Sequence, residues 1–552
     1  MFDYEKRTIK FLFESSVKQF PDEIALSYVD EDPFTYNKVD KIVQSLKKVL
    51  IERDVEKGDR VAILSENCPQ WGMIYFAVAS LGAVNVPILP DFHKSEVHHI
   101  LRNSGAKILF ISSKLLHKLN DSDIKNIKNV VCIDNAQVPP LKYKLEFFDE
   151  VIKEESTVKL PDTDVVEDDL VEILYTSGTT GHSKGVMLTN RNICSNALAA
   201  INFIEIVKSD RLMSILPMAH SYECTCGFVA PVTMGAKVFY IKGLPTAQTL
   251  LPAVEKIQPT IILSVPLIME KIYKKKVLGQ INGKAVTKKL YSVPAFKKTL
   301  NKIAGKKLYK AFGGKLKFMV FGGAATPPEV EEFLTQGGFP YTTGYGLTES
   351  SPLLTANPLG QVKMQSAGKV VNEVRIRIDD PDPETGIGEI VATGPNIMQG
   401  YYKNEEATKS TFTSDGWLKT GDRGYIDDEG YLFIKGRSKN IIVGPSGENI
   451  FPEEIEFYLA QSPYALESLV YESNGKIVAR MFLDYDKIDA EFNTHTMDES
   501  HASEIIRNLL DEIRKNANKQ LASFKRVHQV IEQTEEFEKT PTKKIKRYLY
   551  TA

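Results

Sequence analysis

Strand-like and helix-like segments alternate along the first part of the chain, and this alternation restricts the possible folds more than any other feature. Residues 58–64 (GDRVAIL), 84–89 (VNVPIL) and 107–112 (KILFIS) are apolar and strand-like. Two segments have helical length and spacing. They are residues 71–83 (WGMIYFAVASLGA), where the predicted helix ends at Gly82, and residues 95–106 (SEVHHILRNSGA). Such an order predicts an α/β fold with a largely parallel sheet.

A second α/β stretch is expected to begin near Val171. The segment from about Asp134 to Asp168, with its prolines and mixed charges, is interpreted as a surface connection. Between roughly Glu270 and Lys315 the chain is rich in lysine and prone to form helices. From Gly360 to about Lys435, short apolar runs separated by Gly and Pro turns predict a β-rich module.

The length of 552 residues exceeds what one hydrophobic core accommodates. We expect a large N-terminal domain over residues 1–437, made of doubly wound α/β subdomains plus the β-rich module. Residues 438–552 contain a helix (PEEIEFYLAQS), two strands, a long helix (SEIIRNLLDEIRKNANKQL) and a basic tail. This last part is predicted to be a small, separate α+β domain.

Composition excludes several classes of protein. The formal net charge of -2 argues against a surface dominated by nucleic-acid or anionic-membrane binding. The five cysteines are odd in number and dispersed, which favours reduced thiols in a cytoplasmic enzyme over disulfides, and their spacing does not suggest zinc. No signal peptide is evident at the N-terminus, and no window contains the roughly 18 apolar residues that a spanning helix needs.

Residues 176–186 (TSGTTGHSKGV) follow the strand-like run VEILY and combine glycines, hydroxyl side chains and a lysine. Backbone N–H groups in such a loop converge to bind anions, and a lysine adds a mobile positive charge. The Walker pattern is absent, because Ser183 precedes Lys184 and Gly185 follows it. We expect a loop between two strands that closes over phosphates, with a helix beginning near Asn190. A flexible surface hairpin is the alternative.

The same stretch resembles the phosphate loop of the adenylate-forming superfamily, which includes acyl-CoA synthetases, nonribosomal-peptide adenylation domains and firefly luciferase. Other motifs of that superfamily occur in its order. They are LPMAHSYE (216–223), FGGAA (321–325), GYGLTES (344–350), GWLKTGDRG (416–424), GRSKNIIV (436–443), GENIFPEEIE (447–456) and TKKIKR (542–547). Each motif is weak alone, but the ordered set spans the chain and is specific.

The resemblance implies that a carboxylate attacks the α-phosphate of ATP to give an acyl-adenylate and pyrophosphate, with Mg²⁺ as the metal. The thiol of coenzyme A then displaces AMP. Negative charge must be stabilised in both steps, and water must be excluded from the mixed anhydride.

By resemblance, the phosphate loop and the motif GYGLTES hold the triphosphate, the adenine and the metal. The loop residues expected to cradle the β- and γ-phosphates are Thr176, Ser177, Gly178, Thr179, Thr180, Gly181 and Lys184. Tyr345 is expected to stack on adenine, Thr348 to bond the α-phosphate, and Glu349 to help hold Mg²⁺, which favours hard oxygen ligands. The alternatives are a core tyrosine and an acidic residue at a helix start.

Gly323 and Ala324 are expected to let the backbone approach the adenine edge, although the same residues also suit a simple turn after a strand. Asp422 is expected to accept hydrogen bonds from both ribose hydroxyls, and Arg437 to reach the ribose. For these two residues the alternative is a salt bridge at a surface turn.

His220 corresponds to a residue near the carboxylate end of the acyl site. A lone histidine is more often structural, and a general base is not required because a fatty acid is ionised near neutral pH. Lys544 corresponds to the C-terminal lysine that contacts the substrate carboxylate and the α-phosphate. The family has Gly where this chain has Lys543, but the position of Ile545 favours Lys544. Without the resemblance, KKIKR is a solvated basic tail.

Lys439 occupies the hinge position of the family, about which the C-terminal domain rotates between the two half-reactions. Gly447 is expected on the face presented after rotation, close to the pantetheine of coenzyme A.

LPMAHSYE and the downstream SVPLIMEKIY resemble long-chain fatty acid–CoA ligases more than the acetate or aromatic-acid branches. The expected function is therefore long-chain fatty acid–CoA ligation by a cytoplasmic enzyme, with possible transient contact with the inner face of the membrane and no nucleic-acid partner. One alternative is transfer of the acyl group to acyl carrier protein. Another is a catalytically silent homologue that binds nucleotide or lipid.

Overall fold

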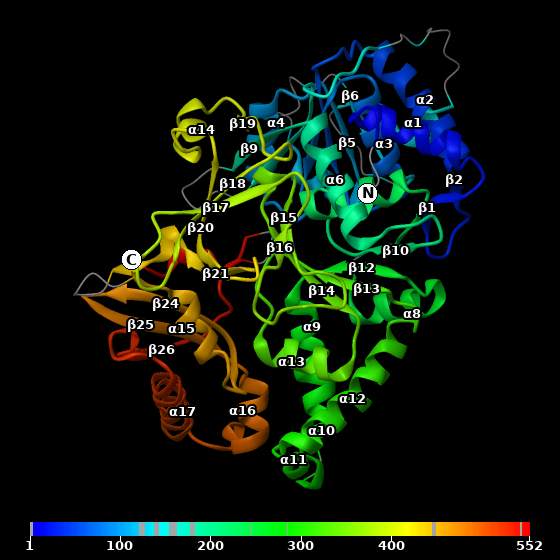
Figure 1. Ribbon diagram of the computed structural model, residues 1–552. Helices are drawn as coiled ribbons and strands as arrows, with labels where there is room; N and C mark the ends of the chain where they lie inside the picture. Colours follow the sequence, from blue (N-terminus) through cyan, green and yellow to red (C-terminus); the bar gives the residue numbers. More distant parts are fainter. Residues whose placement is uncertain are drawn as a thin grey trace. The chain divides into compact units, whose positions relative to one another are not determined.

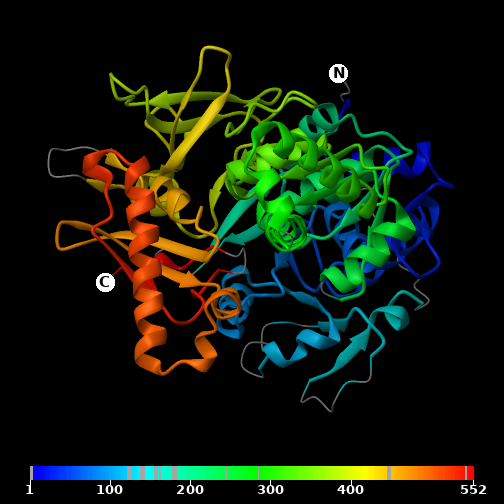
Figure 2. The same ribbon diagram turned by 90° about the horizontal axis from the view of Figure 1, so that it is seen from below.

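The computed structural model describes residues 4–120, 127, 129–136, 138, 143–153, 160, 163–176, 183–243, 245–283, 285–443, 449–540 and 544–551 (Figures 1 and 2). The chain divides into two compact units. Unit 1 comprises Met1–Ile376, Ala392–Leu418 and Asp427–Leu432. Unit 2 comprises Arg377–Val391, Lys419–Ile426 and Phe433–Ala552.

The first sheet of unit 1 has eight strands in the order β19-β9-β8-β4-β3-β5-β6-β7. The pairs from β8 to β7 are parallel, whereas β9 is antiparallel to both β8 and β19. Its strands are β19 (Gly400–Tyr401), β9 (Lys184–Thr189), β8 (Leu170–Thr176), β4 (Val84–Ile88), β3 (Arg60–Leu64), β5 (Ile108–Ile111), β6 (Asn129–Cys132) and β7 (Leu145–Phe147).

The second sheet has nine strands in the order β16-β15-β14-β13-β12-β10-β11-β1-β2. Five of its pairs are parallel, and antiparallel pairs occur only toward its two edges. Its strands are β16 (Lys369–Val370), β15 (Leu353–Ala356), β14 (Tyr341–Gly346), β13 (Phe318–Phe321), β12 (Ile261–Ser264), β10 (Arg211–Ser214), β11 (Lys237–Tyr240), β1 (Ile24–Tyr28) and β2 (Phe34–Thr35). Both sheets confirm the predicted α/β class.

The helices of unit 1 form layers on both faces of these sheets, as a doubly wound fold requires. They are α1 (Ile9–Gln19), α2 (Tyr36–Glu52), α3 (Pro69–Ser80), α4 (Lys94–Ser104), η1 (Ser113–Lys118), α5 (Phe148–Val151), α6 (Asn190–Ile204), η2 (Tyr222–Val229), α7 (Ala230–Thr233), α8 (Ala247–Ile257), α9 (Pro266–Ile272), η3 (Tyr273–Leu278), α10 (Gly279–Asn282), α11 (Ala285–Tyr291), α12 (Pro294–Ala311), α13 (Pro328–Gly337), η4 (Thr348–Ser350) and α14 (Glu405–Thr411).

The alternation of side chains along β3 shows how the layers are built. Val61 and Ile63 belong to the core that α3, α6 and η2 share with strands of both sheets. Ala62 and Leu64 belong to the core on the other face, beneath α4. Because side chains of a strand alternate between faces, an apolar run is buried on both sides. Helix α3 is buried at every residue except Gln70, which explains its nearly continuous apolar sequence.

A four-stranded sheet, in the order β17-β18-β20-β21, has most of its residues in unit 2. The C-terminal part of unit 2 adds a three-stranded sheet, β24-β25-β26, and a two-stranded one, β22-β23. The elements are β17 (Arg375–Asp379), β18 (Gly388–Thr393), β20 (Leu418–Ile426), β21 (Leu432–Arg437), η5 (Ser438–Asn440), β22 (Ile442–Val443), β23 (Asn449–Ile450), α15 (Pro452–Leu459), β24 (Ala465–Ser473), β25 (Lys476–Leu483), α16 (Tyr485–Phe492), η6 (Thr494–Thr496), α17 (Glu499–Gln520), η7 (Ser523–Lys525), β26 (Gln529–Gln533) and η8 (Arg547–Leu549).

The segment from Asp134 to Asp168 is more than the predicted surface connection. It contains β7, which extends the eight-stranded sheet by parallel pairing with β6, and the short helix α5. Phe148 and Val151 of α5 are buried in the core. The short run LEFFDEVI was concealed in the sequence by its flanking prolines and charges. Within the described ranges, no helix is long and apolar enough to cross a membrane.

Candidate active site

Strands β8 and β9 flank the predicted phosphate loop. They pair antiparallel with Thr176 opposite Lys184, so the two strands end together at the loop. This confirms that the loop joins two strands. The predicted loop residues Ser177, Gly178, Thr179, Thr180 and Gly181 lie outside the described residues.

Helix α6 begins directly after β9, at the predicted Asn190. Thr189 and Asn192 form a capping box, in which each side chain accepts from the backbone N–H of the other residue, at 3.2 and 2.8 Å. Such a box satisfies N–H groups that the first helical turn leaves unpaired. The turn from β9 into α6 is therefore fixed by local hydrogen bonds.

Lys184 lies over the ring of Tyr401, with its Nζ 5.0 Å from the ring centroid. Tyr401 is brought there by strand β19, in which it pairs with Val186 of β9. A lysine ammonium over an aromatic ring is stabilised by the ring quadrupole. The lysine at the end of the phosphate loop thus has an aromatic support from a distant part of the sequence.

Tyr401 also contacts Glu349. Its hydroxyl donates a hydrogen bond of 2.8 Å to Glu349 Oε1. Burial raises the pKa of Tyr401, and the neighbouring Glu349 raises it further, so the hydroxyl stays protonated at neutral pH and acts as a donor. Lys184, Tyr401 and Glu349 form one connected group, which we call the Lys184–Tyr401–Glu349 cluster.

Glu349 is held by the tight turn between β14 and β15. Its carbonyl accepts from the N–H of Met398 at 2.9 Å, and Thr348 precedes it in η4. At Gly346 a Cβ atom would lie 1.8 Å from the carbonyl oxygen of Pro352. Only glycine fits this approach, so the motif GYGLTES needs its second glycine for packing.

Tyr345 and the turn after β13 lie at the same edge of the nine-stranded sheet. Strands β13 and β14 are parallel, with Phe321 opposite Thr343, so Gly323 and Tyr345 both follow this pair toward the carboxyl ends. Gly323 has φ +83°, and Gly323 and Ala324 are exposed. Tyr345 is half-buried against a neighbouring apolar cluster, so part of the residue contributes to packing and part is accessible.

His220 lies near this edge as well. Its Nδ1 accepts from the backbone N–H of Tyr222 at 3.2 Å, which places the proton of a neutral ring on Nε2. The Tyr222 hydroxyl donates to the carbonyl of Val320 in β13 at 3.0 Å. Asn67 fixes the loop just before His220, because its side-chain amide donates to Leu216 O at 2.6 Å and accepts from Met218 N at 2.8 Å.

In unit 2, Asp422 and Arg437 form an ion pair, with Arg437 Nε 2.9 Å from Asp422 Oδ1. Asp422 is buried in β20, where Gly421 has φ +72°, and Arg437 is exposed at the end of β21. The salt bridge between these two residues, the alternative to ribose binding, is present. Ribose binding by either residue stays a prediction. Lys439 is exposed in η5, and Gly447 lies outside the described residues.

Lys544 is exposed at the end of a hairpin in unit 2. The backbones of Lys539 and Ile545 form an antiparallel β-bridge, and the N–H of Thr540 donates to Lys544 O at 2.7 Å. Ile545 packs against an apolar cluster that contains Leu469. Because the half-buried Ile545 packs against this cluster, the adjacent Lys544 is exposed to solvent.

The hairpin is anchored on both sides. Arg547 forms an ion pair of 2.7 Å with Glu456, and Lys539 forms one with Glu467. These contacts attach the C-terminal tail to helix α15 and strand β24 of the same unit.

The model of the family described as AMP-binding enzyme matches residues 13–402, well over half of the chain. The chain belongs to the AMP-binding enzyme family. Membership confirms the adenylate-forming assignment that the motifs predicted. Adenylate-forming CoA ligases use ATP, Mg²⁺ and coenzyme A.

Individual relatives of this AMP-binding enzyme are named for different substrates. The 4-coumarate–CoA ligase 2 of Solanum tuberosum is 28% identical over 93% of this chain and 88% of its own length. A long-chain-fatty-acid–CoA ligase of Bacillus subtilis (strain 168) is 28% identical over 82% of this chain and 80% of its own. The crystal structure of the anthranilate CoA ligase AuaEII with anthranoyl-AMP has a TM-score of 0.79 at 21% identity, covering 98% and 96% of the two chains. The last likeness confirms the fold.

Glu349 gives the AMP-binding enzyme a donor suited to Mg²⁺. Across the described residues, no group of three or more His, Cys, Asp or Glu side chains is placed to hold a metal. Mg²⁺ usually binds one or two carboxylates together with substrate phosphates and water. The single half-buried carboxylate of Glu349 in the Lys184–Tyr401–Glu349 cluster fits this chemistry.

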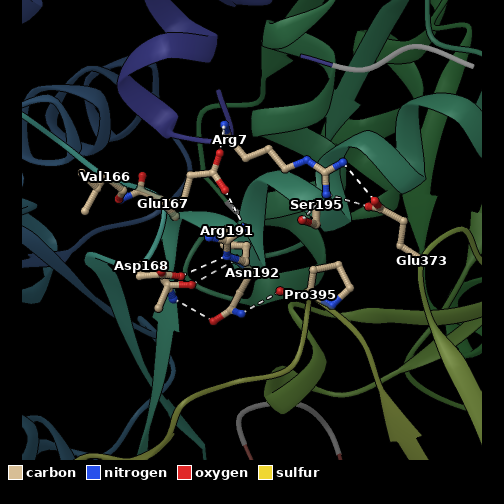
Figure 3. Close-up of polar contacts among 11 residues, drawn as sticks. Arg7, Val166, Glu167, Asp168, Arg191, Asn192, Ser195, Glu373 and Pro395 are labelled. Carbon is tan, nitrogen blue, oxygen red and sulfur yellow. Dashed lines mark hydrogen bonds and ion pairs between the residues drawn. The ribbon is translucent and has the colours of Figure 1, made fainter. Parts of the chain in front are cut away.

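The motifs did not identify two residues of this region. Tyr401 belongs to the Lys184–Tyr401–Glu349 cluster, and Asn192 holds the segment that leads to Tyr401. The Asn192 amide donates to the carbonyls of Pro395 and Ile397, both at 2.8 Å (Figure 3). This links the start of α6 to the segment that leads into β19 and Tyr401. Nothing local in the sequence near residue 192 signals a partner two hundred positions away.

A network of ion pairs surrounds Asn192 (Figure 3). Arg7 forms two hydrogen bonds with Glu373, at 2.7 and 3.0 Å, and its Nη1 also donates to Ser195 Oγ at 3.0 Å. Arg191 pairs with Glu167 at 2.7 Å. The N-terminal segment, the residues just before β8 and helix α6 are thereby tied together.

Proposed function

We propose that this AMP-binding enzyme is a long-chain fatty acid–CoA ligase. It would activate a fatty acid with ATP to acyl-AMP and pyrophosphate, and then form acyl-CoA with release of AMP. The observation that carries the proposal is the Lys184–Tyr401–Glu349 cluster, which puts a cation and a carboxylate beside the phosphate loop. A triphosphate with its metal requires this pairing of charges.

The residues of unit 1 would divide the binding of ATP among them. Lys184 and the loop from Thr176 would neutralise the β- and γ-phosphates, and Glu349 would hold Mg²⁺, which when bound stabilises charge on the phosphate oxygens. Thr348 would bond the α-phosphate. Tyr345 would stack on the adenine, whose edge would meet the exposed backbone of Gly323 and Ala324.

Three residues of unit 2 have proposed roles in ribose binding and in the first half-reaction. Asp422 would accept from the ribose hydroxyls, with Arg437 orienting its carboxylate through their ion pair. The ammonium of Lys544, exposed on its anchored hairpin, would stabilise charge on the carboxylate and α-phosphate as the anhydride forms.

The second half-reaction would need a rearrangement of the C-terminal part, residues 438–552, about Lys439. Movement of Lys544 away from the adenylate would make room for coenzyme A, with Gly447 near the pantetheine. A single site would thus serve two reactions in sequence.

The fatty acid carboxylate is ionised at neutral pH and needs no general base. His220 would instead bind or gate the carboxylate through its Nε2–H group, since its Nδ1 accepts from Tyr222. The long-chain preference is supported by the likeness to the Bacillus subtilis ligase and by the motif LPMAHSYE. Each buried methylene contributes about 0.8 kcal/mol, so chain length should strongly affect binding.

ATP–pyrophosphate exchange with palmitate, hexanoate and 4-coumarate tests the acid. We expect the highest kcat/KM with palmitate, and higher values with 4-coumarate would reject the long-chain assignment. Thioester formation with coenzyme A and with holo acyl carrier protein then tests the acceptor. Turnover with the carrier protein alone would identify an acyl carrier protein synthetase, and no AMP release with any acid would indicate a silent homologue.

A further inference from the structure

The segment between Glu270 and Glu329 has an unusual charge. It contains fifteen lysines, no arginine and no aspartate or glutamate, whereas the whole chain has a net charge of -2. The positive charge is therefore local. It belongs to unit 1, in α9, η3, α11, α12 and the turn after them.

Among the described lysines of this segment, most form no ion pair with a carboxylate. Ion pairs hold Lys274 to Glu270, Lys297 to Glu332 and Lys317 to Asp210. Others on α11 and α12 are exposed, and in the part of the chain that the structure describes they form no ion pair. They are Lys288, Lys289, Lys298, Lys302, Lys306 and Lys307. We call these six the basic face.

Apolar side chains are exposed beside the basic face. The exposed fractions are 71% for Val286, 43% for Val293, 52% for Phe296 and 50% for Ile303. A solvent-exposed helix normally turns such side chains inward, so three on two consecutive helices and one in the turn between them form a patch that water solvates poorly.

Helix α12 is fixed so that this patch points outward. Its buried residues are Asn301, Gly305 and Leu308, and a Cβ atom at Gly305 would lie 2.4 Å from Gly337 O in α13. Phe296 and Ile303 are seven residues apart, or about two helical turns, on the side opposite Gly305. Close packing against α13 therefore leaves them no inward position.

We propose that α11 and α12 dock the enzyme on the surface of an anionic lipid bilayer. Lysines would lie among the lipid phosphates while Phe296, Ile303 and Val286 enter the boundary between headgroups and acyl chains. A nucleic acid would also attract the lysines, but it offers no apolar layer for these side chains. The helices extend from the rest of unit 1 at its lower end in Figure 1 and face the viewer in Figure 2.

Sedimentation with vesicles tests the proposal without ATP or any acid, so its outcome does not depend on the proposed activity. The vesicles are phosphatidylcholine alone, or phosphatidylcholine with roughly a third phosphatidylserine. We expect binding only to the anionic vesicles, weakened by added salt because exposed charges are screened.

Two variants separate charge from apolar insertion. Replacing Lys298, Lys302, Lys306 and Lys307 with Gln should lower the vesicle partition coefficient about a hundredfold or more. The double variant Phe296→Ser/Ile303→Ser should lower it about tenfold or more without changing the net charge. The matched control replaces exposed lysines elsewhere in unit 1 with Gln, namely Lys6, Lys18, Lys41 and Lys409, and should bind as the wild type does.

Equal loss in the control variant would show a general charge effect and overturn the proposal. So would wild-type binding by both α12 variants, or absence of binding to anionic vesicles by a wild-type protein with a normal circular dichroism spectrum. Binding to double-stranded DNA that is lost in the lysine variant but unaffected by Phe296→Ser/Ile303→Ser, without vesicle binding, would replace the lipid surface by a polyanion.

Discussion

The hydroxyl of Tyr401 donates a hydrogen bond of 2.8 Å to Glu349 Oε1 while Lys184 lies over the same ring. One tyrosine thus links the predicted phosphate lysine to the predicted metal carboxylate. Its position depends on β19 pairing with β9, so the geometry of the site is tied to the edge of the eight-stranded sheet.

Tyr401→Phe should keep the ring under Lys184 and remove only the hydrogen bond to Glu349. Because hydrogen bonds to charged groups contribute about 1.5–3 kcal/mol, we expect pyrophosphate exchange to fall by about tenfold or more, with a changed Mg²⁺ dependence. Titration with Mg²⁺ measures both. Tyr402→Phe is the matched control, and an equal effect there would refute the role of the Tyr401 hydroxyl.

Lys544→Ala should abolish adenylate formation, by about a hundredfold or more, because a group that stabilises developing charge is removed. Thioester formation from supplied acyl-AMP should continue. Separate assays of the two half-reactions measure this. Lys546→Ala on the same hairpin is the control, and equal loss of both half-reactions in Lys544→Ala would contradict the assigned role.

Asn192→Asp should keep the capping oxygen that accepts from Thr189 and lose the donors to Pro395 and Ile397. A buried charge would then face two carbonyls, so we expect a stability loss of about 2–4 kcal/mol. Thermal unfolding and pyrophosphate exchange below the transition measure stability and positioning separately. A lower Tm with unchanged exchange would show that Asn192 does not position Tyr401.

Glu172 predicts a pH dependence of stability. Burial raises the pKa of this carboxyl to about 8, and its Oε2 accepts from the Tyr75 hydroxyl at 3.3 Å. The folded state therefore binds a proton that the unfolded state has released, and the stability that this proton contributes is lost as pH rises from about 4.5 to about 8.

Glu172→Gln removes this titration. Between pH 5 and 8 the apparent Tm of the variant should fall by about 2–5 °C less than that of the wild type. Glu223, whose pKa burial also raises to about 8, should keep part of the slope in the variant. The exposed Glu405→Gln should have the wild-type slope, and a variant slope equal to the wild type would show that Glu172 does not titrate in this range.

Gly346→Ala should disrupt the turn that carries Thr348 and Glu349, because the new Cβ atom would lie 1.8 Å from Pro352 O. We expect a loss of about 3 kcal/mol or more in stability, together with loss of pyrophosphate exchange. Gly279→Ala, where a Cβ atom meets nothing within 4 Å, is the control in calorimetry. Full activity of Gly346→Ala would refute the packing argument.

The local elements of this protein follow from its sequence. The apolar run of α3, the strands β3, β4, β5 and β9, and the start of α6 at Asn190 were all predicted, because periodicity, capping and glycine turns act over a few residues. The ordered motifs likewise identified the superfamily. Strand β7 was missed because so short an edge strand gains its stability from its neighbour β6.

Which distant residues complete each motif depends on the tertiary structure. Tyr401 reaches Lys184 and Glu349 through a two-residue strand, and Asn192 reaches Pro395 and Ile397 across the fold. The same is true of the exposed Phe296 and Ile303, whose outward position follows from the contact between Gly305 and Gly337. Local sequence does not encode these pairings, because they depend on strand register and helix packing between segments that meet only when the chain is folded.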